Sequence, residues 1–407
     1  MEWKEVDIEQ TSIEIIDGDR GKNYPKNNEL TNSGYCLFLS AANVTKNGLQ
    51  FSNNSFITKE KDALLRKGKL IPKDIVLTTR GTVGNVGFYS DDVPYQNMRI
   101  NSGMVIIRPG EDFDTMFLYQ YLRSCYFRAQ ITQFQSGSAQ PQLPISTLQK
   151  MKVIKPDIAA QRRIASILSS LDRKIELNNK INAELEEMAQ AIFKNWFVDF
   201  EPFKDGKFVE SELGMIPEGW KVGSLSDITN NKSTKVEERN DVKVLSPVTT
   251  GELVLSEEFF TKQVFSSSIA KYKVVNQGDF AYNPARINIG SIGRNEFDFV
   301  GCVSPVYVVF SVLKGYEYFF DLFRKRSFFK DSVVSLAIGG VRQSLSFDDF
   351  GMIKTIIPPL EIVEKFNKLY EPIKRTIRGN NMQNTHLSLL RDTLLPRLMS
   401  GELEVPE

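Results

Sequence analysis

Histidine and cysteine are nearly absent from this chain of 407 residues, which has one His and three Cys. Zinc sites are usually built from clusters of these two residue types, so their scarcity argues against such a site. The cysteines are scattered, and they form neither a disulfide framework nor a CxxC pair. His386 falls on the outer face of a predicted helix, where we interpret it as a surface residue. No GxxxxGK[ST] phosphate loop is present, so the sequence predicts no catalytic residue and no metal site.

Long apolar stretches and an excess of one charge are also missing. No run approaches the roughly 18 apolar residues that span a bilayer, and the first residues lack the apolar core of a signal peptide. We therefore expect a cytoplasmic protein with no membrane partner. The net charge of +1 is not the footprint of a strongly basic nucleic-acid binder, so any DNA-binding charge has to be local.

The chain does contain an internal repeat with an offset of about 202 residues. A period this long exceeds the roughly 20 to 50 residues of a solenoid unit, so it indicates two similar domains in one chain. Three pairs of segments show the repeat. The segment from Gly137 to Pro156 matches that from Gly339 to Pro358, and the segment from Arg80 to Gly87 matches that from Arg286 to Gly293. A tryptophan stands near the start of each half, as Trp3 and Trp220.

Residues 158–200 carry the clearest periodicity, because apolar positions alternate spacings of four and three as in a coiled-coil seam. Residues 360–401 repeat the pattern, with Arg391 as the one charged seam position. A helix of about 40 residues spans about 60 Å at 1.5 Å per residue. The seam positions are Ile164, Leu168, Leu171, Ile175, Asn178, Asn182, Leu185, Ala189, Ile192 and Trp196, and then Phe366, Tyr370, Ile373, Ile377, Asn380, Asn384, Leu387, Arg391, Leu394 and Leu398.

Asparagine interrupts both seams at equivalent places, as Asn178 and Asn182 in the first helix and Asn380 and Asn384 in the second. If a pseudo-two-fold axis relates the halves, the helices are antiparallel and these side chains meet near the axis. Buried asparagine at a seam costs stability but specifies register. The alternative is that these residues face water at a break in the seam.

The regions outside the helices predict two similar globular α+β domains. Residues 1–157 and 220–359 contain glycine-bounded apolar runs typical of buried strands, together with short helical patterns. Residues 201–219 are rich in Pro, Gly and charge and look like a linker. The expected architecture is therefore two similar globular α+β domains separated by two long antiparallel coiled-coil helices.

Loops that occur in both halves are the candidate DNA contacts. Arginine, hydroxyls and backbone N–H groups near glycine are usual donors to phosphate, whereas Gln and Asn pair with adenine and Arg with guanine. The alternative is a set of tight turns with ordinary loop hydrogen bonds. The candidates are Thr78, Thr79, Arg80, Thr82, Asn85, Gln96, Asn97, Arg99, Gln140 and Gln142 in the first half, and Asn283, Arg286, Asn288, Arg342 and Gln343 in the second.

The first long helix is apolar on more than one face. An exposed apolar stripe marks a partner surface, and the alternative is packing against the protein's own globular domains. The off-seam residues predicted to dock a partner are Ile167, Ile181, Met188, Phe193 and Phe197.

The order and duplication of these phrases resemble the specificity subunit of type I restriction–modification systems, over essentially the whole chain. The phrases that carry the resemblance are Gly68-x2-Ile71-Pro72-Lys73-Asp74 with Arg80-Gly81-Thr82-Val83-Gly84, then Gln161-Arg162-Arg163-Ile164, Ala191 to Phe197, Ile216 to Trp220, and Leu394 to Gly401. The second half departs from the pattern, because Ile287-Asn288 follows Arg286 where the first half has Gly81-Thr82.

The resemblance implies a non-catalytic subunit whose two target-recognition domains each read one half of an interrupted double-stranded DNA sequence. It also implies that the helices dock modification (methyltransferase) and restriction (translocase/endonuclease) subunits. This chain would bind no cofactor, and S-adenosylmethionine, ATP and Mg²⁺ would belong to the partner subunits.

Two other functions remain open at this stage. A free-standing DNA methyltransferase would bind S-adenosylmethionine unaided, but Asn283-Pro284-Ala285-Arg286 departs from the Asn/Asp-Pro-Pro-aromatic motif of that class. The second is a coiled-coil protein-binding scaffold. Its affinity for a peptide would change little with salt concentration, whereas affinity for DNA falls steeply as salt increases.

Overall fold

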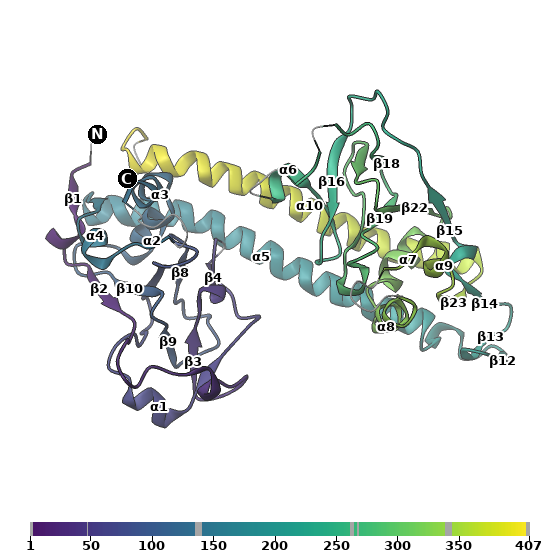
Figure 1. The fold of residues 1–407 in the computed structure, drawn as a ribbon, viewed down its shortest axis with the longest axis horizontal. Helices are drawn as coiled ribbons and strands as arrows, with labels where there is room; N and C mark the ends of the chain where they lie inside the picture. The colour runs from purple at the N-terminus through teal and green to yellow at the C-terminus, as the bar shows by residue number, and fades with distance from the viewer. Residues whose placement is uncertain are drawn as a thin grey trace. The chain divides into compact units, whose positions relative to one another are not determined.

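The computed structural model describes residues 3–46, 48–134, 141–260, 264–266, 268–337 and 344–403. The chain forms two compact units (Figure 1), unit 1 with Met1–Asn179 and Asn381–Glu407, and unit 2 with Lys180–Asn380. Each unit contains one α+β domain, called a head below, and parts of two long helices. The expected α+β class with two long helices is confirmed.

The head of unit 1 is built on a four-stranded antiparallel sheet of order β2-β10-β7-β8. A second sheet of order β6-β3-β9 contains a parallel pair, β3 with β9. The strands are β1 (Glu5–Asp7), β2 (Glu14–Asp17), β3 (Cys36–Leu39), β4 (Val44–Thr45), β5 (Gly48–Leu49), β6 (Phe56–Ile57), β7 (Ile75–Thr78), β8 (Val86–Phe88), β9 (Met98–Ile100), β10 (Met104–Arg108) and β11 (Lys152–Ile154), and the helices are α1 (Lys59–Leu64), α2 (Thr115–Arg123), α3 (Cys125–Phe134) and α4 (Ile145–Gln149).

The head of unit 2 has the same plan, with a four-stranded sheet of order β15-β22-β19-β20 and a second sheet of order β17-β16-β21-β18. Its parallel pair is β16 with β21. The strands are β12 (Phe208–Ser211), β13 (Gly214–Pro217), β14 (Lys221–Ser224), β15 (Thr229–Lys232), β16 (Lys243–Pro247), β17 (Leu253–Leu255), β18 (Lys273–Val275), β19 (Phe280–Tyr282), β20 (Ile292–Arg294), β21 (Gly301–Val303), β22 (Val308–Val312) and β23 (Lys354–Ile357), and the helices are α6 (Ser256–Phe259), α7 (Glu317–Phe323), α8 (Ser327–Leu336) and α9 (Phe347–Gly351).

Each head is closed by an antiparallel strand pair that involves its last strand, β1 with β11 in unit 1 and β14 with β23 in unit 2, where β14 follows the hairpin of β12 and β13. In unit 1, Glu5 pairs with Ile154. In unit 2, Val222 pairs with Ile356, which lies 202 residues after Ile154 in the sequence. The internal repeat seen in the sequence therefore extends to strand order and to register.

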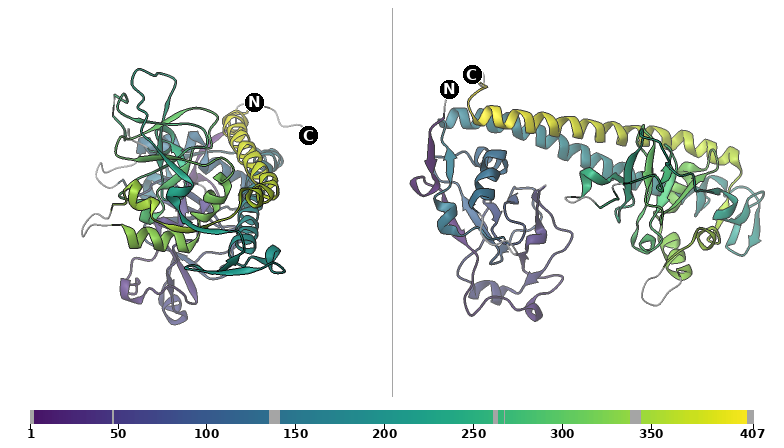
Figure 2. Two further views of the ribbon diagram at one scale, coloured as in Figure 1. Left: turned by 90° about the vertical axis from the view of Figure 1, so that its right-hand side faces the viewer. Right: turned by 45° about the horizontal axis from the view of Figure 1, so that its top comes forward.

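The two long helices are α5 (Ile158–Phe197) and α10 (Leu360–Met399), each of 40 residues. All twenty predicted seam positions are buried or half-buried. Within each unit the helical segments are antiparallel and side by side (Figure 2), because Asn178 bonds Asn384 in unit 1 and Asn182 bonds Asn380 in unit 2.

The helices also supply part of each hydrophobic core. In unit 1, Ile164 and Leu168 of α5 and Leu398 of α10 join the core of the head. In unit 2, Phe193 of α5 packs on Phe319 of α7 and Phe366 of α10, with ring centroids 5.4 and 6.0 Å apart. Aromatic pairs of this kind contribute about 0.5–1.5 kcal/mol each beyond the area they bury. Head and helices in a unit therefore share one core.

Candidate nucleic-acid interface

In unit 1 the loop after β7 is shaped by two threonines. Thr78 is fully buried, and its hydroxyl donates to the carbonyl of Thr82 and accepts from the N–H of Asn85 at 2.9 Å. Thr79 is 3% exposed and donates to the carbonyl of Gly103 at 3.1 Å. These hydroxyls are used within the fold, so they fix the loop and are not available to a ligand.

Arg80 and Gln142, 62 positions apart in the sequence, lie opposite each other in an isolated β-bridge. The carbonyl of Thr79 accepts from the N–H of Leu143 at 2.9 Å, which ties the two segments together. Arg80, Thr82 and Gln142 are all exposed. The structure therefore brings an arginine, a hydroxyl and an amide from two predicted segments to one surface.

The guanidinium of Arg99 is buried and hydrogen-bonded within the head of unit 1. Its guanidinium, 7% exposed, bonds the carboxylate of Asp62 at 2.6 Å and the carbonyls of Asp62, Leu65 and Lys67 at 2.7 to 3.1 Å. Burial raises the pKa of Asp62, but bonds from Lys69 and Arg99 outweigh it and leave the pKa below its usual value. Arg99 therefore anchors α1 to β9, and we remove it from the candidate base contacts.

The other candidates of unit 1 are partly engaged. The amide of Asn85 donates to the carbonyl of Val44 at 2.9 Å. Asn97 is half-buried, and its side-chain oxygen accepts from Lys69 at 3.3 Å. Gln96 is exposed. Of these, Gln96 has the freest side chain.

In unit 2 the loop after β19 presents Arg286 on the surface. Asn283 is half-buried and caps the turn, with its side-chain oxygen accepting from the N–H of Ala285 at 3.0 Å. The carbonyl of Pro284 accepts from the N–H of Leu345 at 3.1 Å, as Thr79 does from Leu143 in unit 1. Arg286 is exposed and Asn288 half-buried. The arginine-bearing loop is thus held in the same way in both heads.

Tyr307 is a neighbour of this loop that the sequence did not reveal. Burial raises its pKa, while the charge of Arg286 and a hydrogen bond with the side chain of Asn283 act in the opposite direction. The strand register also brings Tyr307 to this loop, because Val308 lies opposite Tyr282 at the end of β19. No local pattern indicates this, because Tyr307 precedes β22 and is brought to the loop by strand pairing.

Three candidates, Gln140, Arg342 and Gln343, lie outside the described residues.

The predicted asparagine positions form polar bonds within the helix pair. In unit 1, Asn178 is fully buried and donates to Gln383 and Asn384 at 2.8 Å, and Asn384 donates to Asn179 at 2.8 Å. In unit 2, Asn380 donates to Asn182 at 2.8 Å. The alternative, in which they face water, is excluded for Asn178.

The predicted docking stripe divides into two parts. Phe193 and Phe197 are 1% and 5% exposed in the core of unit 2, so they pack inside the protein and form no exposed docking surface. Ile167 and Ile181 are half-buried, and Met188 is 45% exposed. Spacing alone could not separate these cases, because the head that covers the phenylalanines follows them in sequence.

Within the described ranges, no group of three or more His, Cys, Asp or Glu residues is arranged to hold a metal ion. Nor does any helix in the described part of the chain combine the length and apolarity needed to cross a membrane.

Comparisons with known proteins agree on one family. Residues 2–187 match the family model described as "Type I restriction modification DNA specificity domain". The MjaIX specificity subunit of Methanocaldococcus jannaschii is 30% identical over 352 residues, which cover 83% of this chain and 80% of that one. The HindI specificity subunit of Haemophilus influenzae is 25% identical across 99% of this chain and 100% of its own length. The solved S subunit from M. genitalium shares the fold, with a TM-score of 0.57 at 14% identity over 100% of this chain and 96% of that chain.

Proposed function

Because this chain belongs to the family of type I restriction enzyme specificity subunits, we propose that it reads an interrupted, two-part DNA target, one part with each head. The observation that carries the proposal is the duplicated loop, which presents Arg80 in one head and Arg286 in the other at the same place in the strand order. Arginine on a loop held by backbone bonds is suited to phosphate or guanine.

The two heads carry different side chains around this common loop. Arg80 is accompanied by Gln142, an amide able to pair with adenine, whereas Arg286 is accompanied by Tyr307. We infer that the half-sites differ in sequence for this reason. Gln96 and Thr82 are further exposed candidates in the first head.

The helix pair is the proposed spacer. Each of its helices is 40 residues long, so it covers about 60 Å, and one turn of DNA is about 34–36 Å. The polar bonds of Asn178 with Asn384 and of Asn182 with Asn380 support one register, because a slipped pairing would leave amides among apolar side chains.

The catalytic work falls to partner subunits in this proposal. Modification subunits would bind S-adenosylmethionine, and restriction subunits would use ATP and Mg²⁺, in the cytoplasm where the DNA lies. Ile167, Ile181 and Met188 are the residues of the predicted stripe that retain exposed surface for such partners.

The spacer function can be tested by deleting one heptad from each helix, residues 179–185 together with 377–383, which leaves Asn178 and Asn384 in place to hold the register. Seven residues keep the seam in phase and shorten each helix by about 10.5 Å, which corresponds to about 3 base pairs at 3.4 Å. We expect selection from random DNA to return the same two half-sites with a gap about three base pairs shorter.

Duplicating the same heptads is the matched control, and it should widen the gap by about as much. An unchanged gap in both variants would contradict the spacer, and altered half-sites would contradict separate reading heads. DNA binding that barely responds to salt would contradict the function itself, since release of counterions makes such binding steeply salt-dependent.

A further inference from the structure

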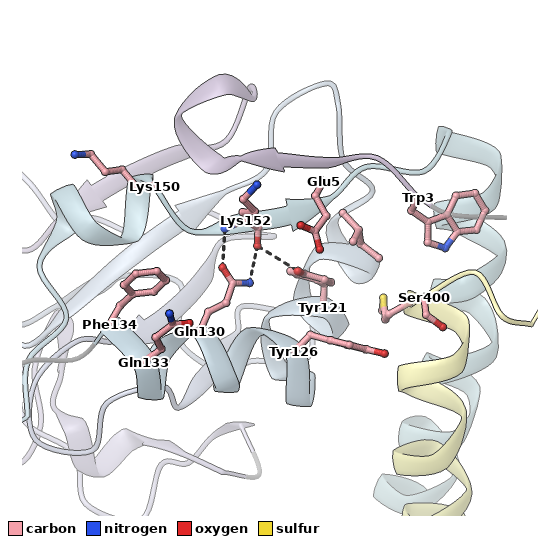
Figure 3. A pocket seen from close by; sticks show the side chains of 12 residues that line it. Trp3, Glu5, Tyr121, Tyr126, Gln130, Gln133, Phe134, Lys150, Lys152 and Ser400 are labelled. Atoms are coloured by element: carbon pink, nitrogen blue, oxygen red, sulfur yellow. Dashed lines mark hydrogen bonds between the residues drawn. The ribbon is translucent and has the colours of Figure 1, made fainter.

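Unit 1 has an open groove of about 660 Å³ beside its closing strand pair. Its walls come from α3, from β1 with β11, and from the end of α10. Figure 3 shows Lys150 and Phe134 toward one end, Trp3 and Ser400 at the other, and Lys152 and Glu5 between them. The lining therefore combines lysine and aromatic side chains with one carboxylate.

Aromatic side chains give the groove its apolar surface. Tyr126 and Phe134 are each 44% exposed, which is high for residues of this size. Trp3 is half-buried, and its indole N–H donates to the carbonyl of Leu398 at 3.2 Å. Exposed aromatic surface ringed by polar groups is typical of a binding site.

The backbone N–H and carbonyl of Lys152 are already hydrogen-bonded. The side-chain amide of Gln130 accepts from the N–H of Lys152 at 2.7 Å and donates to its carbonyl at 3.0 Å, so it closes the edge of β11 (Figure 3). A bound segment would therefore not extend this strand pair at Lys152. It would be recognised by the side chains.

The equivalent face of unit 2 is partly covered by the chain itself. There the linker forms a 3₁₀ turn (Glu201–Phe203) and the hairpin of β12 and β13. Phe203 packs on Trp220 at 5.1 Å, and Ile216 is 3% exposed in the core. Glu212, in the hairpin turn, forms an ion pair with Lys354.

The two faces correspond position by position. Trp3 stands two residues before Glu5, which pairs with Ile154, and Trp220 stands two residues before Val222, which pairs with Ile356. Lys354 lies 202 residues after Lys152, the repeat offset. In unit 2 the chain itself thus occupies the part of this face that lies beside the tryptophan and the lysine, whereas in unit 1 that part is open. The occupant there places a carboxylate on the lysine and a phenyl ring on the tryptophan.

The groove differs from its counterpart in charge. Lys150 stands where unit 2 has Met352, and Glu5 stands where it has Val222. These two replacements add one charge of each sign, so an occupant of unit 1 would meet two more charged side chains than the linker meets in unit 2, and an acidic group on it could pair with Lys150 and Lys152.

We propose that this groove binds a polypeptide segment of an assembly partner, carrying an acidic side chain that meets Lys150 and Lys152 and an aromatic or aliphatic side chain that packs between Trp3 and Tyr126. This inference rests on the proposed function, because it assumes that the chain assembles with a modification subunit. It adds the place on this chain where that subunit would dock.

The test uses the full chain and its co-expressed modification subunit. Lys152→Glu should weaken their association about tenfold or more, because a carboxylate then faces the acidic group of the partner. Arg128→Glu is the matched control, since Arg128 is exposed on α3 and does not line the groove, and it should change the affinity by less than about twofold. DNA binding by the isolated chain should stay unchanged in both variants.

A photo-crosslinker identifies the occupant directly. With benzoylphenylalanine in place of Tyr126, irradiation of the complex should join the chain to a modification-subunit segment that contains Asp or Glu. Crosslinks to DNA, to a second copy or to the chain's own residues would overturn the proposal, as would equal effects of Lys152→Glu and Arg128→Glu. If the chain failed to bind DNA, the proposed function would fail independently of the groove.

Discussion

Asp172 on α5 and Arg391 on α10 form an ion pair of 2.8 Å although 219 positions separate them. Arg391 is the one charged residue in the two predicted seams, and this pair explains why it is tolerated there. The same carboxylate accepts from Arg123 at 2.9 Å and from Gln120 at 2.7 Å. Three donors from α2 and α10 therefore converge on one carboxylate of α5, and they join the head of unit 1 to both helices.

Asp172→Asn should destabilise the protein in a pH-dependent way. Burial raises the pKa of Asp172, but Arg123, Arg391 and Gln120 together bring it below 3.8. A carboxyl whose folded pKa is depressed contributes stability above its unfolded pKa and loses it as pH falls through the folded value. We expect a deficit of about 1–3 kcal/mol at pH 5–8 that shrinks below about pH 4, measured by thermal melting from pH 3 to 8.

Asp392→Asn provides the control, because Asp392 is 62% exposed and such surface pairs are worth only about 0–1 kcal/mol. A deficit for Asp172→Asn that grew in acid would contradict the assignment.

Arg80→Ala and Arg99→Ala should have opposite signatures. Arg80 is exposed, so its loss should leave the melting temperature unchanged and reduce the salt dependence of DNA binding by about one counterion. Loss of Arg99 leaves the carboxylate of Asp62 without one of its two cations, which should cost about 2–4 kcal/mol of stability. Melting curves with salt titrations measure both, and a stable Arg99→Ala that binds DNA weakly would reverse our assignment.

The double change Asn178→Leu with Asn384→Leu should raise stability and weaken the choice of register. The side-chain oxygen of Asn178 is buried without a hydrogen-bond partner among the described residues, so replacing the pair by apolar side chains removes a polar cost of about 1 kcal/mol. We expect a higher melting temperature and a broader distribution of gap lengths in selected DNA targets. Thr385→Leu adds a similar side chain at an exposed neighbouring position and should leave the gap length uniform.

Two glycine-to-alanine changes should alter the free energy of unfolding in opposite directions. Gly290 has a φ of +94°, and a Cβ there would lie 2.8 Å from the carbonyl oxygen of Thr249, so Gly290→Ala should cost about 1–3 kcal/mol and impair DNA binding by displacing Arg286. Gly379 lies within α10 with open space around it, so Gly379→Ala should stabilise by about 0.5–1 kcal/mol. Thermal melting of both variants gives the comparison, and a stabilising Gly290→Ala would contradict the loop geometry.

The sequence by itself determined the features that depend on local periodicity. The spacings of four and three that include Ile164 and Phe366 identify helical faces, because an α-helix repeats every 3.6 residues, and the repeat offset of 202 residues indicates two equivalent domains. It also located the polar positions Asn178 and Asn384, since residues on the seam face the other helix of an antiparallel pair.

Only the tertiary structure decided which polar side chains remain free. Arg80 and Arg99 are alike in sequence terms, yet one is exposed and the other bonds Asp62, because Asp62 arrives from a helix 37 residues earlier. The same holds for Phe193. Its spacing in the sequence predicts a place in an exposed apolar stripe, but in the structure it packs on Phe319 of the head of unit 2. Burial depends on residues distant in the chain, and hydrophobic pattern within one segment carries no information about what covers it.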